Sequence, residues 1–282
     1  MTQLRIKSHA KINLALNITG KSSSLHKIET IVSFISLHDE IFIKRINSKK
    51  HNIIFTGKFS RNISKNNTIS KLLKILENKD FLKNKKFKIL VNKNIPNRAG
   101  LGGGSMNAAN ILKYFVKKKK IIRISKKELE KISHLIGSDV VLGLNSTNSI
   151  LNSKNQIKRF KNYKKFYVLL VKPNFGCSTK YIYSKVKKFS KARLLKPNKN
   201  MFNNKFLKKI GNSLEPIAFS KYNKLKMIKL FLEKSTMPIF VRMSGSGSVI
   251  VAYFKTKGRC DKAKKQVNKK YKKYWCMSSK TI

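Results

Sequence analysis

Acidic residues and cysteines are scarce in this chain. Its 282 residues include 65 Lys and Arg but only 11 Asp and Glu, and the aspartates are Asp39, Asp80, Asp139 and Asp261. A reaction that needs an aspartate as its base therefore has a short list of candidates. The three cysteines lie far apart and form no C-x-x-C pair. Their odd number excludes a complete disulfide framework and indicates thiols in a reducing compartment.

Long apolar runs are also missing. The longest one in the middle of the chain, residues 166–171, is far too short to cross a bilayer, and Lys7, Lys11 and Asn13 interrupt any signal-like segment at the start. A hydrophobic content of 41% still supplies a core. We therefore expect a soluble, cytoplasmic protein without a membrane partner, built as one large domain or two modest ones.

The excess of positive charge raises the possibility of a nucleic-acid-binding protein. A formal net charge of +54 would attract phosphate backbones at low salt. Only nine of the basic residues are Arg, however, whereas proteins that recognise bases and phosphates favour the Arg fork. The lysines are also spread over the whole length, and Lys, Asn and Ile share A/T-rich codons. We interpret the charge mainly as solvated surface, with no specific nucleic-acid partner.

The most informative segment, residues 95–110, has the sequence IPNRAGLGGGSMNAAN. Its glycines are Gly100, Gly102, Gly103 and Gly104. Glycine can adopt positive φ and bring backbone N–H groups close to an anion. Ser105 and Met106 then begin a helical run, and a helix N-terminus carries partial positive charge and unpaired N–H donors. The segment suits the phosphate chain of a kinase's phosphate donor.

Spacing excludes two better-known glycine loops. A Walker A loop needs Lys and then Ser or Thr after its last glycine, but Ser105 and Met106 follow Gly104. A dinucleotide-binding G-x-G-x-x-G that begins at Gly100 needs glycine at position 105. Taken alone, the segment is equally consistent with a flexible turn between the strand-like residues 87–91 and the next helix. Motifs elsewhere in the chain decide between the two.

Apolar spacing predicts the elements around these motifs. In the first half we expect strands over 11–18, within 31–43 and over 87–91, and helices over 67–76, after the glycine loop to about 116, and from 126 to Gly137. Ser125 and Glu128 form a capping box for the last of these helices, which leaves Asp139 in the turn beyond it. In the second half we expect strands over 166–171, 238–242, 248–254 and 274–277, helices over 179–187, 206–219, 222–232 and 262–271, and a poorly ordered basic loop over 188–203.

Three motifs occur in the order, and at roughly the spacing, of one kinase superfamily. They are AKINL at residues 10–14, the glycine loop at 96–109 and MSGSGS at 243–248, with GSDV at 137–140 between them. On these motifs the chain resembles the superfamily named for galactokinase, homoserine kinase, mevalonate kinase and phosphomevalonate kinase. Nearly its full length resembles the members that act on a cytidyl diphosphate in the non-mevalonate route to isoprenoid precursors.

The resemblance implies an ATP-dependent phosphorylation of the 2-hydroxyl of a methylerythritol moiety. Asp139 matches the family's catalytic aspartate and Lys11 its partner lysine. A carboxylate can accept the hydroxyl proton, while a nearby ammonium keeps it ionised and offsets charge on the phosphoryl group. Whether Asp139 removes the proton early or mainly orients the hydroxyl stays open. Without the motifs, Lys11 would be one solvated lysine among many and Asp139 a helix-end cap.

The resemblance also implies two sets of binding residues. Those for ATP are Pro96, Gly100, Leu101, Gly102, Gly103, Gly104, Ser105, Met106 and Asn67, and Ser105 is the candidate ligand for Mg²⁺. Those for the substrate are Asn13, His26, Thr179, Tyr183, Gly245 and Ser246. In the family a histidine meets the cytosine edge, as His26 would, and an aromatic ring stacks on the base, as Tyr183 would. An N-cap of the following helix explains Asn67 equally well.

By resemblance the fold is α+β with two domains. These are a ribosomal-protein-like α/β domain over residues 1–155 and a ferredoxin-like domain over residues 156–282, with Lys11, Asp139 and residues 102–105 meeting in the cleft between them. The chain departs from the family pattern at two places. Ser24-Leu25 stands where the family usually has Gly-Tyr before the histidine that matches His26, so one stacking surface for cytosine is missing, and Arg98-Ala99 replaces a glycine-rich lead-in to the phosphate loop. The alternatives are a homoserine or mevalonate kinase of the same superfamily, a basic nucleic-acid-binding protein, or a folded remnant without activity. The oligomeric state is left open.

Overall fold

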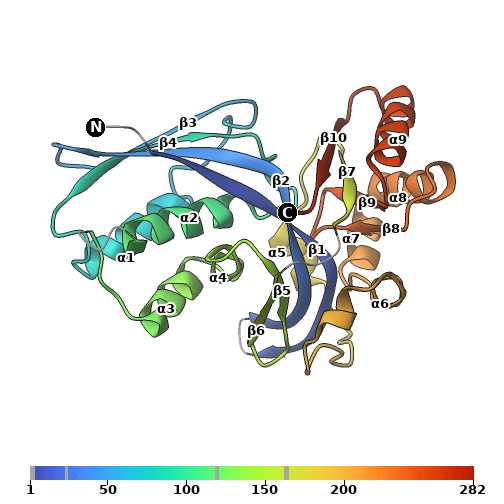
Figure 1. Ribbon diagram of the computed structural model, residues 1–282, viewed down its shortest axis with the longest axis horizontal. Coiled ribbons are helices and arrows are strands. Elements are labelled where there is room, and N and C mark those ends of the chain that lie inside the picture. The colour runs from blue at the N-terminus through green and yellow to red at the C-terminus, as the bar shows by residue number, and fades with distance from the viewer. Residues whose placement is uncertain (1–3, 23–24, 118–120, 162–164) are drawn as a thin grey trace. The chain divides into compact units, whose positions relative to one another are not determined.

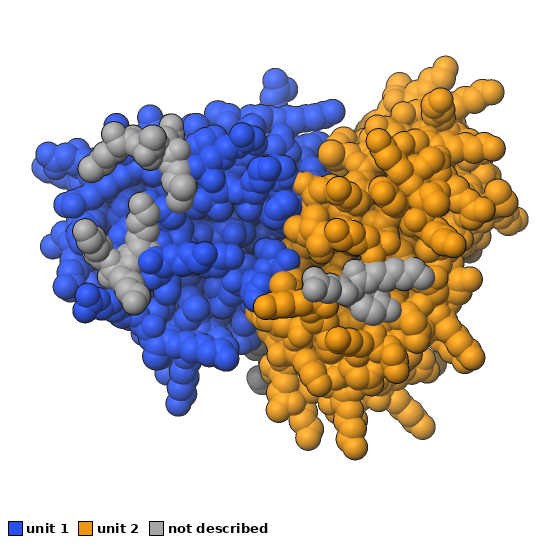
Figure 2. Space-filling model, in the orientation of Figure 1, with its two compact units in different colours: residues 1–10, 37–97, 102–146 blue, residues 11–36, 98–101, 147–282 orange. Residues whose placement is uncertain are grey.

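The computed structural model describes residues 4–22, 25–117, 121–161 and 165–282. By internal contacts the chain divides into two compact units (Figure 2). Unit 1 contains residues 1–10, 37–97 and 102–146, and unit 2 contains residues 11–36, 98–101 and 147–282. The first two strands each contribute residues to both units. The predicted domain boundary near residue 155 stays a prediction. The two units are not separated at a single point of the chain, because these strands belong partly to each of them.

The predicted α+β class is confirmed, since helices and two sheets make up the described chain (Figure 1). The elements of its first half are β1 Leu4–Ser22, β2 Leu25–Ile46, β3 Asn52–Thr56, α1 Thr68–Asn78, β4 Lys86–Asn92, α2 Gly103–Lys117, α3 Lys126–Ile136, α4 Val140–Gly143, β5 Asn148–Leu151 and β6 Ile157–Phe160. Those of its second half are β7 Tyr167–Lys172, α5 Thr179–Ser184, the 3₁₀ helix η1 Lys199–Phe202, α6 Asn204–Lys209, α7 Glu215–Lys221, α8 Asn223–Ser235, β8 Phe240–Met243, β9 Ile250–Phe254, α9 Lys257–Lys270 and β10 Trp275–Lys280.

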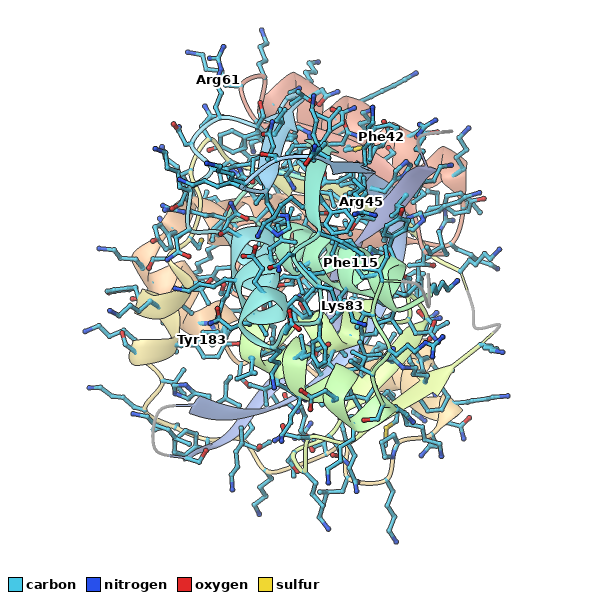
Figure 3. The ribbon with its side chains drawn as sticks, turned by 90° about the vertical axis from the view of Figure 1, so that its left-hand side faces the viewer. Phe42, Arg45, Arg61, Lys83, Phe115 and Tyr183 are labelled. Carbon is cyan, nitrogen blue, oxygen red and sulfur yellow. The ribbon has the colours of Figure 1, made fainter. Side chains whose placement is uncertain are left out.

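Unit 1 packs helices against one face of a sheet. β4 pairs antiparallel with β2 and parallel with β3, and Figure 1 shows α1 to α4 on one side of these strands. Every second residue over 41–43 of β2 and over 87–91 of β4 is buried and meets the helices in one core, in which Phe115 of α2 is fully buried (Figure 3). The oxygen of Asn67 accepts the N–H groups of Ile69 and Ser70, so the predicted N-cap of α1 is confirmed.

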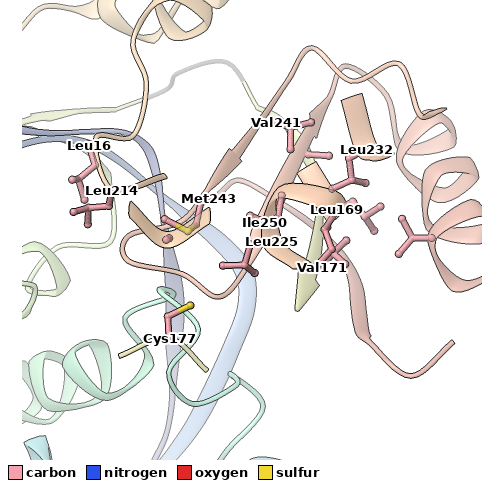
Figure 4. Packing of buried hydrophobic residues seen from close by; sticks show 14 of the residues in the cluster. Leu16, Leu169, Val171, Cys177, Leu214, Leu225, Leu232, Val241, Met243 and Ile250 are labelled. Carbon is pink, nitrogen blue, oxygen red and sulfur yellow. The ribbon is translucent and has the colours of Figure 1, made fainter. Parts of the chain in front are cut away.

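Unit 2 contains an antiparallel sheet in the order β10-β7-β9-β8, with α8 and α9 packed on it. Leu169 and Val171 of β7, Val241 of β8 and Ile250 of β9 belong to the buried apolar cluster of this unit (Figure 4). The same unit holds a smaller antiparallel ladder in which β5 pairs with β2 and β6. The core therefore supports the segment 243–250 that joins β8 to β9.

Two expectations for the second half of the chain are wrong. The helix predicted over 206–219 is broken into α6 and α7, because the N–H of Leu16 binds the carbonyl of Gly211 at 3.1 Å and Asn212 forms a bridge with Leu16. The basic loop after α5 is not loose. The buried carboxylate of Glu29 accepts the N–H groups of Arg193 (2.8 Å) and Leu194 (3.1 Å), which fixes the loop to β2.

Candidate active site

Lys11 is a buried lysine in β1, only 3% exposed. Its Nζ donates to Oδ1 of Asn13 at 2.7 Å, and the Nδ2 group of Asn13 donates to Oγ1 of Thr30 at 2.8 Å. The Thr30 hydroxyl donates in turn to the carbonyl of Ala15 at 2.7 Å. Because the hydroxyl of Thr30 takes the amide N–H of Asn13, the amide oxygen faces the ammonium of Lys11. The side chain of Lys11 is thus buried and fixed by a hydrogen bond, unlike that of a lysine on the solvated surface.

The start of the glycine loop lies beside Lys11 within unit 2. The backbone N–H of Lys11 donates to the carbonyl of Leu101 at 3.0 Å, and the hydroxyl of Ser244 donates to the carbonyl of Gly100 at 2.8 Å. Gly100 has a φ of +74°, and a Cβ there would lie 1.9 Å from the carbonyl oxygen of Ser244. Only glycine permits this close approach of two loops.

The side chain of Asn212 fixes the loop at residues 243–248 through hydrogen bonds to the backbone of the loop. Its Nδ2 group donates to the carbonyls of Met243 (2.9 Å) and Gly245 (2.8 Å), and the backbone N–H of Met243 donates to the carboxylate of Glu215 at 2.8 Å. The hydroxyl groups of Ser246 and Thr179 lie 2.9 Å apart. The structure thus brings Asn13, Gly245, Ser246 and Thr179 of the predicted substrate set into one region of unit 2.

His26 and Tyr183, the predicted pair for the cytosine base, are neighbours. Their ring centroids are 5.4 Å apart and the rings are tilted by 53°. Tyr183 lies on α5 (Figure 3), and β2 carries His26. Burial and, to a smaller extent, the charge of Lys21 lower the pKa of His26 below its ordinary value. At neutral pH the imidazole is therefore uncharged and offers one donor and one acceptor.

In unit 1 the glycine loop enters helix α2 earlier than expected. The helix begins at Gly103, so Gly103 and Gly104 form its first turn and Ser105 is already inside it. The N–H of Met106 closes this turn on the carbonyl of Gly102 at 2.8 Å. The hydroxyl of Thr68, next to Asn67, donates to the carbonyl of Gly104 at 2.8 Å, so the starts of α1 and α2 are adjacent.

Asp139 follows the end of α3, as the sequence predicts, and it stands at the start of the short helix α4, which the sequence analysis does not predict. Its carboxylate makes no capping hydrogen bond to α4, which removes the N-cap of α4 as an explanation for the residue. α4 packs closely on α2, because a Cβ at Gly143 would lie 2.7 Å from Cβ of Ala109 and 3.0 Å from Sδ of Met106. The small residues fix the position of α4, and hence of Asp139, relative to α2.

Comparisons with known proteins decide the family. A protein of Pelagibacter ubique named 4-diphosphocytidyl-2-C-methyl-D-erythritol kinase is 57% identical over all 282 residues, which cover 100% of both chains. A protein of the same name from Petrotoga mobilis is 34% identical over 88% of this chain and 97% of its own. Residues 67–151 match the description "GHMP kinases N terminal domain". This chain belongs to the 4-diphosphocytidyl-2-C-methyl-D-erythritol kinase family of GHMP kinases.

Solved structures give the same fold. A crystal structure of a 4-(cytidine 5'-diphospho)-2C-methyl-D-erythritol kinase superposes with a TM-score of 0.77 at 21% identity and covers 99% of each chain. A homoserine kinase from Cytophaga hutchinsonii superposes with a TM-score of 0.70 at 15% identity, covering 98% of this chain and 95% of its own. These structures give the chain the two-domain fold of the GHMP kinases, and the relative that is 57% identical over the whole length makes it an ATP-dependent small-molecule kinase.

Several predicted roles in this GHMP kinase stay predictions. Lys11 lies in unit 2 and Asp139 in unit 1, so their expected meeting is not tested. Asn67 caps α1, which accounts for its side chain without a nucleotide. Among the departures, Arg98 adopts a left-handed φ of +49°, a conformation that glycine adopts without strain. Ser24, which replaces a usual glycine before His26, lies outside the described residues.

Sequence reasoning missed four residues that organise the site. They are Thr30, Asp39, Asn212 and Ser244. Ser244 lies in a recognised motif, and Asp39 is conspicuous as one of four aspartates, so both carried a signal in the sequence. Thr30 and Asn212 carried none, because their importance depends on which backbone and amide groups the fold brings next to them.

Proposed function

We propose that this chain transfers the γ-phosphoryl group of ATP to the 2-hydroxyl of 4-diphosphocytidyl-2-C-methyl-D-erythritol, a step of the non-mevalonate route to isoprenoid precursors. The observation that carries the proposal is the 57% identity over the whole of both chains. The burial of Lys11 and the pairing of His26 with Tyr183 support it independently, since each gives a structural context to a residue with an expected role.

The phosphate chain of ATP is proposed to bind the first turn of α2. Here Gly103, Gly104 and Ser105 present backbone N–H groups at the positive end of the helix dipole, which suits an anion. Pro96, Gly100, Leu101, Gly102 and Met106 complete the proposed loop contacts, and Asn67 adds one on the adenine side. Because a triphosphate is strongly negative, it would bind together with a cation.

Mg²⁺ is proposed to accompany the nucleotide. Kinases bind this ion through substrate phosphates and only one or two protein oxygens, so a site of three or more protein ligands is not required. Among the described residues no cluster of three His, Cys, Asp or Glu is suited to a metal, and the Ser105 hydroxyl in the first turn of α2 supplies an oxygen of the right kind. The ion would neutralise phosphate charge during transfer.

Asp139 and Lys11 are proposed as the catalytic residues. The carboxylate of Asp139 accepts the proton of the attacking hydroxyl, or holds that hydroxyl in line for attack. Lys11 provides positive charge that offsets the charge developing on the transferred group. The hydrogen bond from Nζ to Asn13 limits the rotamers of the lysine, so its position is set before substrate binds.

Specificity for the cytidyl group is proposed to come from unit 2. Neutral His26 can both donate to and accept from the hydrogen-bonding edge of cytosine, and Tyr183 offers a flat ring for stacking. Asn13, Thr179, Gly245 and Ser246 supply hydroxyl, amide and backbone groups nearby.

We also propose the domain boundary near residue 155 and a cytoplasmic location, the latter because the three cysteines form no disulfide. Among the described residues no helix is both long and apolar enough to cross a membrane.

A coupled assay of ATP consumption with purified protein tests the proposal. We expect turnover with 4-diphosphocytidyl-2-C-methyl-D-erythritol and none above background with homoserine or mevalonate. Mass spectrometry of the product should show one added phosphoryl group, and its phosphorus spectrum should place that group on the 2-oxygen. Turnover of homoserine without turnover of the cytidyl compound would reject the proposed substrate.

A further inference from the structure

Asp39 of β2 is a fully buried carboxylate, with 0% exposure, that lies outside the proposed catalytic residues. Its Oδ1 accepts the backbone N–H groups of Asn94 and Ile95, both at 2.8 Å. Its Oδ2 accepts from Nδ2 of Asn107 at 2.9 Å and from Nζ of Lys93. A buried carboxylate is costly unless donors surround it, and here four donors do so.

The donors come from the two flanks of the glycine loop. Lys93, Asn94 and Ile95 follow β4 and immediately precede the loop, whereas Asn107 lies in the second turn of α2, just after it. The carboxylate of Asp39 therefore links the segment before the loop to the helix α2 that follows the loop. Two of the three hydrogen bonds from the flank before the loop, those of Asn94 and Ile95, are donated by the backbone, so they fix the path of the chain itself.

Lys93 also lies at the start of α2. A Cβ built at Gly103, the first residue of the helix, would be 3.3 Å from Nζ of Lys93. An ammonium group at this end of a helix is unfavourable by itself, because the helix dipole already places positive charge there. Asp39 supplies the opposite charge that keeps the lysine at this position although its side chain is only 4% exposed.

We propose that Asp39 is a positioning residue for the phosphate loop: it fixes both flanks of the loop and holds Lys93 against the first turn of α2. The inference rests on the proposed binding of ATP phosphates at that turn. It predicts that damage to the Asp39 cluster weakens ATP binding, whereas binding of the acceptor substrate, assigned to residues of unit 2, is unaffected.

Asp39→Asn is the direct test. Asparagine keeps the size and one acceptor oxygen, but its NH₂ group would face the donors Lys93 and Asn107. We expect the KM for ATP, and the Kd of ATP measured by calorimetry without acceptor, to rise at least about tenfold, because small misplacements of a binding loop are costly. The KM for the cytidyl substrate should stay within about twofold of the wild-type value.

Asn107→Leu gives a second variant if Asp39→Asn does not fold. Leucine has a similar size, and Oδ1 of Asn107 already lacks a hydrogen-bond partner within the described chain, so the change removes mainly the bond to Asp39. Leu76→Ala is the control, because Leu76 is a fully buried core residue of α1 in the same unit. It should lower the melting temperature and leave the Kd of ATP unchanged.

An unchanged Kd of ATP in a folded Asp39→Asn protein, or in Asn107→Leu where only that variant folds, would overturn the proposal. An equal rise in Leu76→Ala would also overturn it, since the effect would then be general destabilisation. These outcomes are separate from those of the proposed function. Wild-type protein that binds ATP but does not phosphorylate the cytidyl compound would reject the substrate and leave the test of Asp39 intact.

Discussion

The four aspartates of this chain differ in what surrounds each carboxylate. That of Asp39 is fully buried and takes four hydrogen bonds. Asp80 is exposed in a turn with a φ of +52°, and Asp261 lies on α9. Asp139 is half-buried and makes no capping hydrogen bond to the helix that it begins. Capping of α4 therefore does not account for the carboxylate of Asp139.

Replacing Asp139 with Asn should lower kcat by several orders of magnitude, because an amide cannot accept the hydroxyl proton. The free energy of unfolding in urea should change by less than about 1 kcal/mol, since asparagine keeps the size of the side chain and no capping hydrogen bond of α4 is lost. Asp261→Asn is the matched control and should keep wild-type turnover. An Asp139→Asn enzyme with undiminished kcat would show that the residue has no catalytic role.

Thr30 should affect catalysis although it is not expected to touch a substrate. Thr30→Val keeps the shape but leaves Nδ2 of Asn13 and the carbonyl of Ala15 without their partner, at a cost of about 1–3 kcal/mol in unfolding free energy. The amide of Asn13 is then free to turn away from Lys11, so kcat should fall about tenfold or more while the KM for ATP stays constant. Thr30→Ser restores the hydroxyl and should recover most of the loss. Equal kcat values in the Val and Ser variants would contradict the proposal that Thr30 positions Lys11 through Asn13.

If His26 contacts the cytosine as proposed, we expect binding of the cytidyl substrate to depend on pH. Its pKa lies below the ordinary value of 6.5, first because burial disfavours the cation and second because Lys21 repels it. The imidazole is thus neutral at pH 7, and the KM for the cytidyl substrate should be constant there and rise as acid protonates the ring. Lys21→Gln removes the second cause, so the rise should begin at a higher pH. A profile that does not move in this variant would argue against His26 as the titrating group.

At the scale of elements, local patterns predicted most helices and strands but not their interruptions. The caps of α1 and α3 were visible as Asn67 and Ser125, because N-caps act within three residues. The break between α6 and α7 was not visible, since it depends on pairing of Gly211 and Asn212 with Leu16, almost 200 positions away. The same limit applies to the site. Motifs gave Lys11 and Asp139, whereas Thr30 and Asp39 depend on partners that only the fold supplies.

The contact between α2 and α4 offers a test at this scale. Gly143→Ala would place a methyl group 2.7 Å from Cβ of Ala109, and such overpacking typically costs about 1–3 kcal/mol. Because α4 carries Asp139 at its start, kcat should fall together with stability. Adding Ala109→Gly removes the shortest contact of the new methyl group and leaves only the flexible side chain of Met106 to adjust, so it should restore part of kcat, although glycine inside α2 costs about 1 kcal/mol of its own. If the double variant is no more active than Gly143→Ala, close packing of α4 does not position Asp139.

For the whole molecule, the scarce acids and the abundant lysines have different places. Glu29 and Asp39 are fully buried and hydrogen-bond backbone N–H groups, so part of the small acidic complement is used inside the protein. Most lysines are exposed, and Figure 3 shows long nitrogen-tipped side chains that extend outward around the view. The buried Arg242 instead donates to the carbonyls of Leu14 and Leu207. Net charge therefore reports on the surface and not on the site.

A diffuse positive surface and a specific nucleic-acid site differ in their response to salt. If the lysines act only as a field, fluorescence anisotropy should show binding of unrelated DNA duplexes at 50 mM salt with similar affinities. That affinity should fall at least about a hundredfold by 200 mM salt, because each phosphate contact releases a counterion. Kinase turnover, which depends on hydrogen bonds in the site, should persist at the higher salt. Tight binding that remains at 200 mM and prefers one sequence would instead favour a nucleic-acid-binding role, since base contacts survive the loss of the electrostatic contribution.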